Sequence, residues 1–111
     1  MKYGNKKTII DGITFDSALE AARYSELKLL QRAGAIRDLK LQPVFELIPG
    51  FTKNGITYRR TVYKADFAYY DNEKGKTVIE DTKGFKTKEY ILKKKLFEYN
   101  YPNLQIVEIT R

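Results

Sequence analysis

The chain has 111 residues, enough for one domain around one hydrophobic core. Its net charge of +7 fits a polyanionic partner, but it also fits a lysine-rich surface that serves solubility, so charge alone does not decide between the two. The chain contains no cysteine and no histidine, which excludes disulfide scaffolds, thiolate or imidazole zinc sites, cysteine nucleophiles and Ser-His-Asp triads. Any catalysis must therefore use carboxylates, lysines, hydroxyls or a bound ion.

The N-terminal region is basic and lacks the apolar core of a signal peptide. We predict that residues 1–8 form a flexible basic arm and that residues 9–111 form a single domain. No apolar run is long enough for a transmembrane helix, so we expect a cytoplasmic protein that does not contact membranes. Residues 9–15 predict a small hairpin, because Asp11-Gly12 is a turn signal.

A first helix is predicted from Ser17 to Ala33, ending at Gly34. Ser17 and Glu20 have the spacing of a capping box, so Glu20 can be explained as a helix cap. Glu26 lies within the apolar arc of this helix, which is unusual for a glutamate unless it is paired, for example with Arg23.

Three strands are predicted next, over residues 35–48, 58–70 and 76–83. Pro43 cannot donate to a sheet ladder, so the first of them should be an edge strand or bulged there. Pro49-Gly50 and Asn54-Gly55 predict turns after it, and residues 71–75 predict the turn between the second and third strands.

A second helix is predicted over residues 87–100, stopped by Pro102, and residues 104–110 alternate as a final strand. The order is thus helix, three strands, helix, strand. Turns join the first three strands, which should be antiparallel, and the crossover helix should make the last pair parallel. We therefore predict an α/β fold with a mixed four-stranded sheet flanked by two helices.

Charged residues occur at the ends of two predicted strands. Asp81 and Lys83 are two positions apart, so their side chains point to the same face, and Glu80 points to the other. If the strands are neighbours, Asp66 and Asp81 converge at one end of the sheet, where a hard cation such as Mg²⁺ would balance them. An Asp-x-Lys triplet at a strand end is also common as a solvated ion pair, so the triplet alone leaves both interpretations open.

This arrangement resembles the PD-(D/E)XK nuclease superfamily, with Ala65 in place of the proline. The chain is more closely similar to a small phage-encoded family of unassigned, nuclease-like proteins that look like Holliday-junction resolvases. That resemblance runs through residues 11–17, 20–21, 41–43, 66–67, 80–84 and 93–96. It implies a restriction-endonuclease-like core and DNA hydrolysis that depends on Mg²⁺ or Mn²⁺.

The resemblance also implies residue roles. Asp66 and Asp81 would bind the metal, Glu20 would add a further carboxylate unless Glu26 does, and Lys83 would orient the attacking water. Little of the chain is left for reading bases, so we expect a structure-selective enzyme. Its expected substrate is a four-way junction or other branched DNA in phage recombination or replication. We expect it to act as a homodimer. The cations expected to contact DNA are Lys86, Lys88, Lys94, Lys95, Arg59 and Arg60.

Two other functions remain open from the sequence. One is a nucleic-acid-binding protein that keeps the nuclease fold without catalysis. The other is an interaction module of a phage replication complex, whose basic helix meets an acidic partner. The lysines of the second helix also fit an ordinary solvated face.

Overall fold

A mixed sheet of four strands lies at the centre of the computed structural model, which describes residues 6–83 and 85–110. Across the sheet the strands are β10 (Ile106–Ile109), β9 (Lys76–Thr82), β8 (Phe67–Asp71) and β3 (Ile36–Leu41). β10 runs parallel to β9, whereas β9 is antiparallel to β8 and β8 is antiparallel to β3. The predicted α/β class and the mixed sheet with one parallel pair are therefore confirmed.

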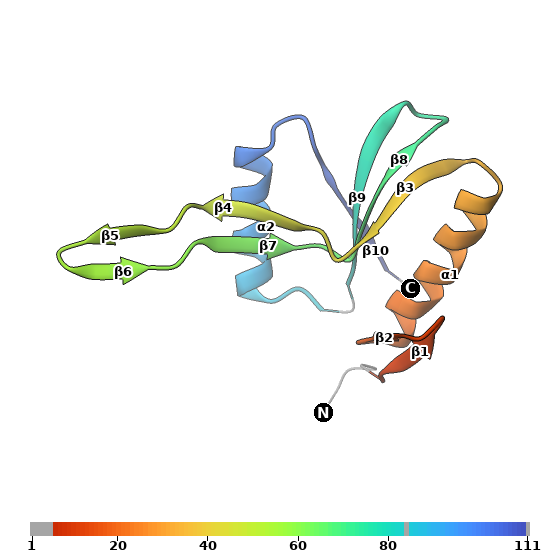
Figure 1. The fold of residues 1–111 in the computed structure, drawn as a ribbon, viewed down its shortest axis with the longest axis horizontal. Coiled ribbons are helices and arrows are strands. Elements are labelled where there is room, and N and C mark those ends of the chain that lie inside the picture. Colours follow the sequence, from red (N-terminus) through yellow and green to blue (C-terminus); the bar gives the residue numbers. More distant parts are fainter. Residues whose placement is uncertain (1–5, 84, 111) are drawn as a thin grey trace.

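One helix packs on each side of this sheet, α1 (Ala18–Arg32) and α2 (Lys88–Asn100) (Figure 1). Ser17 Oγ accepts a hydrogen bond of 3.1 Å from the N–H of Glu20, and Thr87 Oγ1 accepts one of 3.0 Å from the N–H of Tyr90. These N-caps satisfy backbone donors that the first helical turn leaves unpaired. Gly34, with φ of +83°, follows α1 as predicted.

The two faces of β9 contribute to different hydrophobic cores. Val78 packs in the core beneath α1, whereas Ile79 packs in the core beneath α2. Because side chains alternate along a strand, the next two residues divide in the same way. Glu80 bonds to Arg23 of α1, and Asp81 bonds to Tyr63 of the α2 core.

Two predicted strands are wrong in their extent, because the chain leaves the sheet within each of them. The segment 35–48 divides into β3 and β4 (Val44–Ile48), and the segment 58–70 is interrupted between β6 (Ile56–Tyr58), β7 (Thr61–Lys64) and β8. The bends face each other: the N–H of Gln42 donates to the Asp66 carbonyl at 2.9 Å, and that of Ala65 donates to the Pro43 carbonyl at 3.1 Å. Pro43 has no N–H to extend the ladder of hydrogen bonds. β3 is an edge strand of the sheet, as the position of Pro43 predicted.

The chain between these bends forms a two-stranded projection, here called the ribbon (residues 44–64). β4 pairs with β7, and β5 (Phe51–Lys53) pairs with β6 through the predicted Asn54-Gly55 turn. Figure 1 shows the ribbon extending from the body past α2. The radius of gyration of 15.8 Å reflects this projection, since a compact chain of this length has a value of about 13 Å.

The predicted N-terminal hairpin is confirmed as β1 (Thr8–Ile10) and β2 (Ile13–Phe15). Asp11 and Gly12 have φ of 55° and 75°, as a tight hairpin turn requires. Residues 1–5 of the predicted basic arm lie outside the described residues, and Thr8 already pairs with Phe15. In the part of the chain that the structure describes, neither helix has the length and apolar character needed to cross a membrane.

Candidate active site

Asp66 lies beside the end of β9, where the ribbon returns to the sheet. Its N–H donates to the Glu80 carbonyl at 3.1 Å. Its Oδ2 accepts hydrogen bonds from the N–H and the hydroxyl of Thr82, at 2.7 and 2.6 Å. These bonds fix the Asp66 carboxylate next to the Asp81-Thr82-Lys83 triplet, although Asp66 lies in the bend between β7 and β8 and not in the predicted continuous strand.

Asp81 is only 3% exposed and has two polar neighbours. Its Oδ2 accepts a short hydrogen bond from the Tyr63 hydroxyl, and its Oδ1 lies 3.1 Å from Lys83 Nζ. The same ammonium lies 3.9 Å from the centre of the Tyr90 ring. Burial, with a contribution from Asp66, raises the pKa of Asp81 to about 6, although Tyr63 and Lys83 oppose the shift.

Glu20 approaches the same end of the sheet from α1. It is 4% exposed, and among the described residues its Oε2 is buried with no hydrogen-bond partner. Burial is the main cause that raises the pKa of Glu20 to about 7, and the charges of Asp66, Asp16 and Asp81 add to it. A buried carboxylate oxygen without a donor is costly, and a cation beside it would remove that cost.

The three carboxylates fit a hard divalent cation by their chemistry, since Mg²⁺ takes oxygen ligands and is often held by one or two carboxylates plus waters. The structure brings Asp66 next to the end of β9 that carries Asp81, and Glu20 Oε2 is a buried acceptor without a donor among the described residues. Within residues 6–83 and 85–110, however, no three acidic side chains stand close enough to form a ready-made metal cluster.

A third buried carboxylate, Glu80, was not predicted to have a structural role. It is 1% exposed and accepts bonds from Arg23 Nε and Nη2, at 2.8 and 2.7 Å, and from the Tyr69 hydroxyl at 2.5 Å. Arg23 Nη1 also bonds to Glu26 at 3.0 Å, so the predicted Arg23–Glu26 pair is confirmed. The sequence did contain a signal for this pair. Glu80 directly follows the apolar residues of β9, and a glutamate buried at such a position needs a cationic partner.

The Asp81–Lys83 pair is reachable from solvent on the α2 side. It lines a pocket of about 200 Å³ together with Tyr63, Thr87 and Tyr90. A larger pocket of about 520 Å³ shares Tyr90 and is lined by the predicted DNA-contacting residues Lys86, Lys94 and Lys95.

The six predicted DNA-contacting cations fall into two groups. Lys86 and Lys94 lie 2.8 and 3.5 Å from the two carboxylate oxygens of Glu108. Lys86 and the Tyr90 hydroxyl lower the pKa of Glu108 to about 2, so it stays ionised and offsets the lysine charge. The other four, Lys88, Lys95, Arg59 and Arg60, are exposed, and the two arginines belong to the ribbon.

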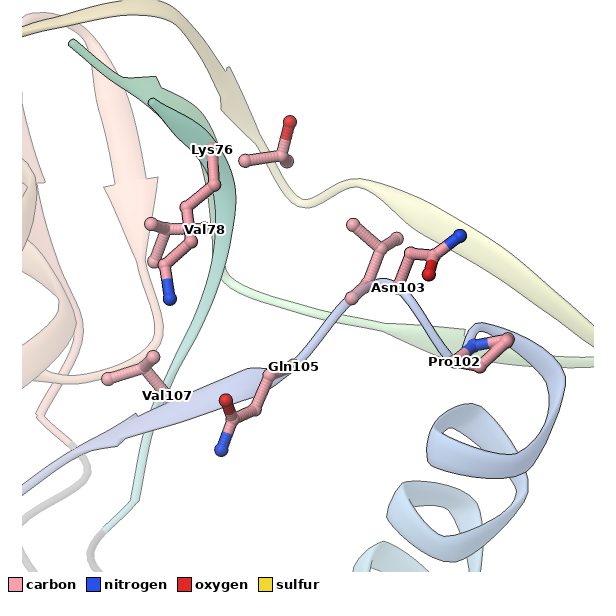
Figure 2. Close-up of a pocket in the computed structure, with 8 residues that line it drawn as sticks. Lys76, Val78, Pro102, Asn103, Gln105 and Val107 are labelled. Atoms are coloured by element: carbon pink, nitrogen blue, oxygen red, sulfur yellow. The ribbon is translucent and has the colours of Figure 1, made fainter. Parts of the chain in front are cut away.

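Another pocket lies at the opposite end of β9, between the start of that strand and the segment leading into β10. Figure 2 shows Lys76 and Val78 on one side of it and Asn103, Gln105 and Val107 on the other. Its lining contains no acidic side chain, so it does not offer the chemistry of the Asp66–Asp81 end.

Comparison with known families gives one match. A family model described as Protein of unknown function (DUF1064) matches residues 1–111, so the chain belongs to that family over its whole length. No curated protein matches the chain.

Proposed function

We propose that this member of the DUF1064 family is a divalent-metal-dependent DNA endonuclease of the PD-(D/E)XK type, built on a restriction-endonuclease-like core. The observation that carries the proposal is the buried Glu20 Oε2, which lacks a donor among the described residues, within electrostatic range of Asp66 and of the Asp81–Lys83 pair. Three carboxylates against one ammonium leave the site short of positive charge. Mg²⁺ or Mn²⁺ would supply that charge and, when bound, would polarise the scissile phosphoryl group.

The chain's own residues have separate tasks in this proposal. Asp66 and Asp81 hold the cation, and the Thr82 bonds keep Asp66 in its orientation. Lys83, held between Asp81 and the Tyr90 ring, can orient a water or stabilise charge on the phosphate in the transition state. Tyr63 donates to Asp81 and so fixes which of its oxygens face the pocket.

The proposed substrate is branched DNA, with four-way junctions first, cut to leave a 5′-phosphate and a 3′-hydroxyl. The proposed setting is recombination or replication of a phage or prophage, in the cytoplasm of the bacterial host, with the protein acting as a homodimer. These finer points rest on the resemblance described above and on the small size of the chain.

A non-catalytic DNA-binding function is the second candidate, because one specific observation favours it. Both oxygens of Asp81 already have a partner in Tyr63 and Lys83, and the carboxylates do not form a ready-made cluster among the described residues. This candidate predicts salt-sensitive binding with no metal requirement.

Cleavage assays separate the two candidates. Labelled linear, flapped and four-way DNA are incubated with Mg²⁺, Mn²⁺ or EDTA, using wild-type protein, Asp81→Asn and Asp38→Asn. Asp38 is an exposed carboxylate on β3 and serves as the matched control. We expect metal-dependent cutting that falls at least about 100-fold in Asp81→Asn and is unchanged in Asp38→Asn. Cutting that survives EDTA would exclude the metal mechanism, and tight binding without cutting would favour the second candidate.

A further inference from the structure

The outer part of the ribbon has no support from the body of the protein. Every residue from 48 to 60 is exposed, whereas the inner part packs on α2 through Phe45, Leu47 and Tyr63. Asn100 Nδ2 and the Tyr101 hydroxyl also bond to the carbonyls of Leu47 and Glu46, at 2.7 and 2.8 Å. The ribbon is thus anchored at its base and presents both faces of its outer half to solvent.

Positive charge is concentrated on this projection. The ribbon (residues 44–64) contains four cations (Lys53, Arg59, Arg60 and Lys64) and one acidic residue, Glu46 at its base, so it carries +3 of the net charge of +7. None of the four forms an ion pair within residues 6–83 and 85–110, in contrast to Lys86 and Lys94 of the α2 region. An unbalanced run of cations on an extended element is complementary to a polyanion.

The outer ribbon also exposes apolar surface. Phe51 and Tyr58 are cross-strand partners whose rings stack with centroids 4.8 Å apart, and they are 48% and 45% exposed. Ile56, beside the turn, is also exposed. An isolated two-stranded hairpin is marginally stable in water, so apolar side chains left open on one are in place for contact with another molecule.

The geometry connects this projection to the candidate active site. β7 leads through Ala65 directly to Asp66, so the base of the ribbon lies at the carboxylates. From Asp66 to Asn54 the chain runs twelve residues, a reach of up to about 40 Å at a strand's rise of about 3.3 Å per residue. One turn of B-DNA spans about 34–36 Å.

We propose that the ribbon is a DNA-contacting arm that lies in a groove of the duplex about one helical turn from the phosphate held at the carboxylates. A major groove of about 12 Å admits a two-stranded β-ribbon. Lys53, Arg59 and Arg60 contact phosphates on either side of the groove, while Phe51, Ile56 and Tyr58 contact sugar and base edges. The proposal deepens the proposed function and rests on DNA being the substrate, but it does not depend on cleavage.

The test measures binding without catalysis. Fluorescence anisotropy in EDTA gives the Kd for a duplex of about 30 base pairs at about 50 and about 200 mM salt. The ribbon variant combines Lys53→Gln, Arg59→Gln and Arg60→Gln. The matched control combines Lys40→Gln, Lys74→Gln and Lys76→Gln, three exposed cations on β3 and around the β8–β9 turn. Circular dichroism checks that both fold.

We expect the ribbon variant to bind about tenfold more weakly, and the slope of log Kd against log salt to fall by about 2–3, as the loss of three phosphate contacts requires. The control variant should change less than about twofold. In hydroxyl-radical footprints with Asp81→Asn, protection one turn from the junction should be lost only with the ribbon variant.

Three outcomes would overturn the proposal: equal weakening of both variants, unchanged binding by the ribbon variant, or a change of oligomeric state without DNA, which would make the ribbon an interface between copies. Ribbon-dependent binding without any cleavage would support the ribbon's role and overturn the nuclease proposal alone. Absence of DNA binding by the wild-type protein would overturn both.

Discussion

Glu80 and Asp81 are consecutive, buried carboxylates on β9, and their surroundings are opposite in character. Glu80 faces α1, where Arg23 approaches it with two nitrogens and Tyr69 donates a further bond. Asp81 faces α2, near Asp66 and Glu20, with the single ammonium of Lys83 against three carboxylates. The carboxylate oxygen left without a donor among the described residues is Glu20 Oε2, which reaches this end of the sheet from α1.

The difference separates two reasons for burying a charge. A carboxylate that accepts two hydrogen bonds from an arginine and one from a hydroxyl is fully paired within the fold. Its removal leaves the arginine partly buried without its partner. A group of carboxylates with too few cations is kept at a cost to stability, which is typical of functional sites. The Glu80 side should therefore matter for folding and the Asp81 side for function.

The largest effect on stability is expected from breaking the Glu80 side. Glu80→Ala should lower the free energy of unfolding by about 3–5 kcal/mol, because it leaves Arg23 partly buried without its main partner. Urea unfolding followed by circular dichroism measures this. Asp81→Asn, which removes a carboxylate whose burial opposes ionisation, is the matched comparison and should cost less than about 1 kcal/mol. Equal losses in the two variants would remove the distinction between the sides.

A smaller effect of opposite sign is expected at Glu20. Its pKa of about 7 in the folded protein lies above the ordinary glutamate value of 4.5, so folding favours the protonated form. The metal-free protein should thus be most stable below about pH 4.5, where Glu20 is protonated in both states. Its free energy of unfolding should fall as the pH rises towards 7, because the unfolded chain then loses the Glu20 proton more readily than the folded protein does. Glu20→Gln should therefore raise the free energy of unfolding on the order of 1–3 kcal/mol at about pH 8 in EDTA, and change it little at about pH 4.

The control for this prediction is Glu73→Gln, which removes an exposed carboxylate in the β8–β9 turn. It should leave both unfolding curves within about 0.5 kcal/mol of wild type. A Glu20→Gln protein less stable than wild type at the higher pH would show that the Glu20 carboxylate stabilises the metal-free fold, contrary to its surroundings.

The local parts of the fold were predictable from the sequence. Of the two sides of β9, the Asp81 side was expected to be functional, whereas the role of Glu80 was not predicted. Ser17 acts through a backbone group three residues away, and Asp11-Gly12 is a turn by itself, so neither depends on the rest of the chain. The order of the elements led us to expect Asp66 near the end of β9, where its bonds to Thr82 place it, although Asp66 lies in the bend between β7 and β8 and not in a strand.

The remaining features depend on residues far apart in the sequence. Arg23 and Glu80 are 57 positions apart, and no local pattern chooses that arginine as the partner. The ribbon likewise depends on two bends, Gln42–Pro43 and Ala65–Asp66, that hydrogen-bond to each other. From the sequence each bend looks like a continuous strand, because its flanking residues favour β structure.

The smallest effect expected is stabilisation by the cation itself. Mg²⁺ that binds only the folded protein should raise the free energy of unfolding by about 1.4 kcal/mol at a concentration of about ten times its Kd. The gain should be present at about pH 8 and much reduced at about pH 5, because Glu20 and Asp81, with pKa values of about 7 and 6, are then protonated and bind a cation poorly. Asp66→Asn and Asp81→Asn should each abolish the gain, whereas Glu80→Gln should keep it despite its lower stability. A gain that survives in Asp81→Asn would place the cation elsewhere and leave the Asp81 side without its proposed ligand.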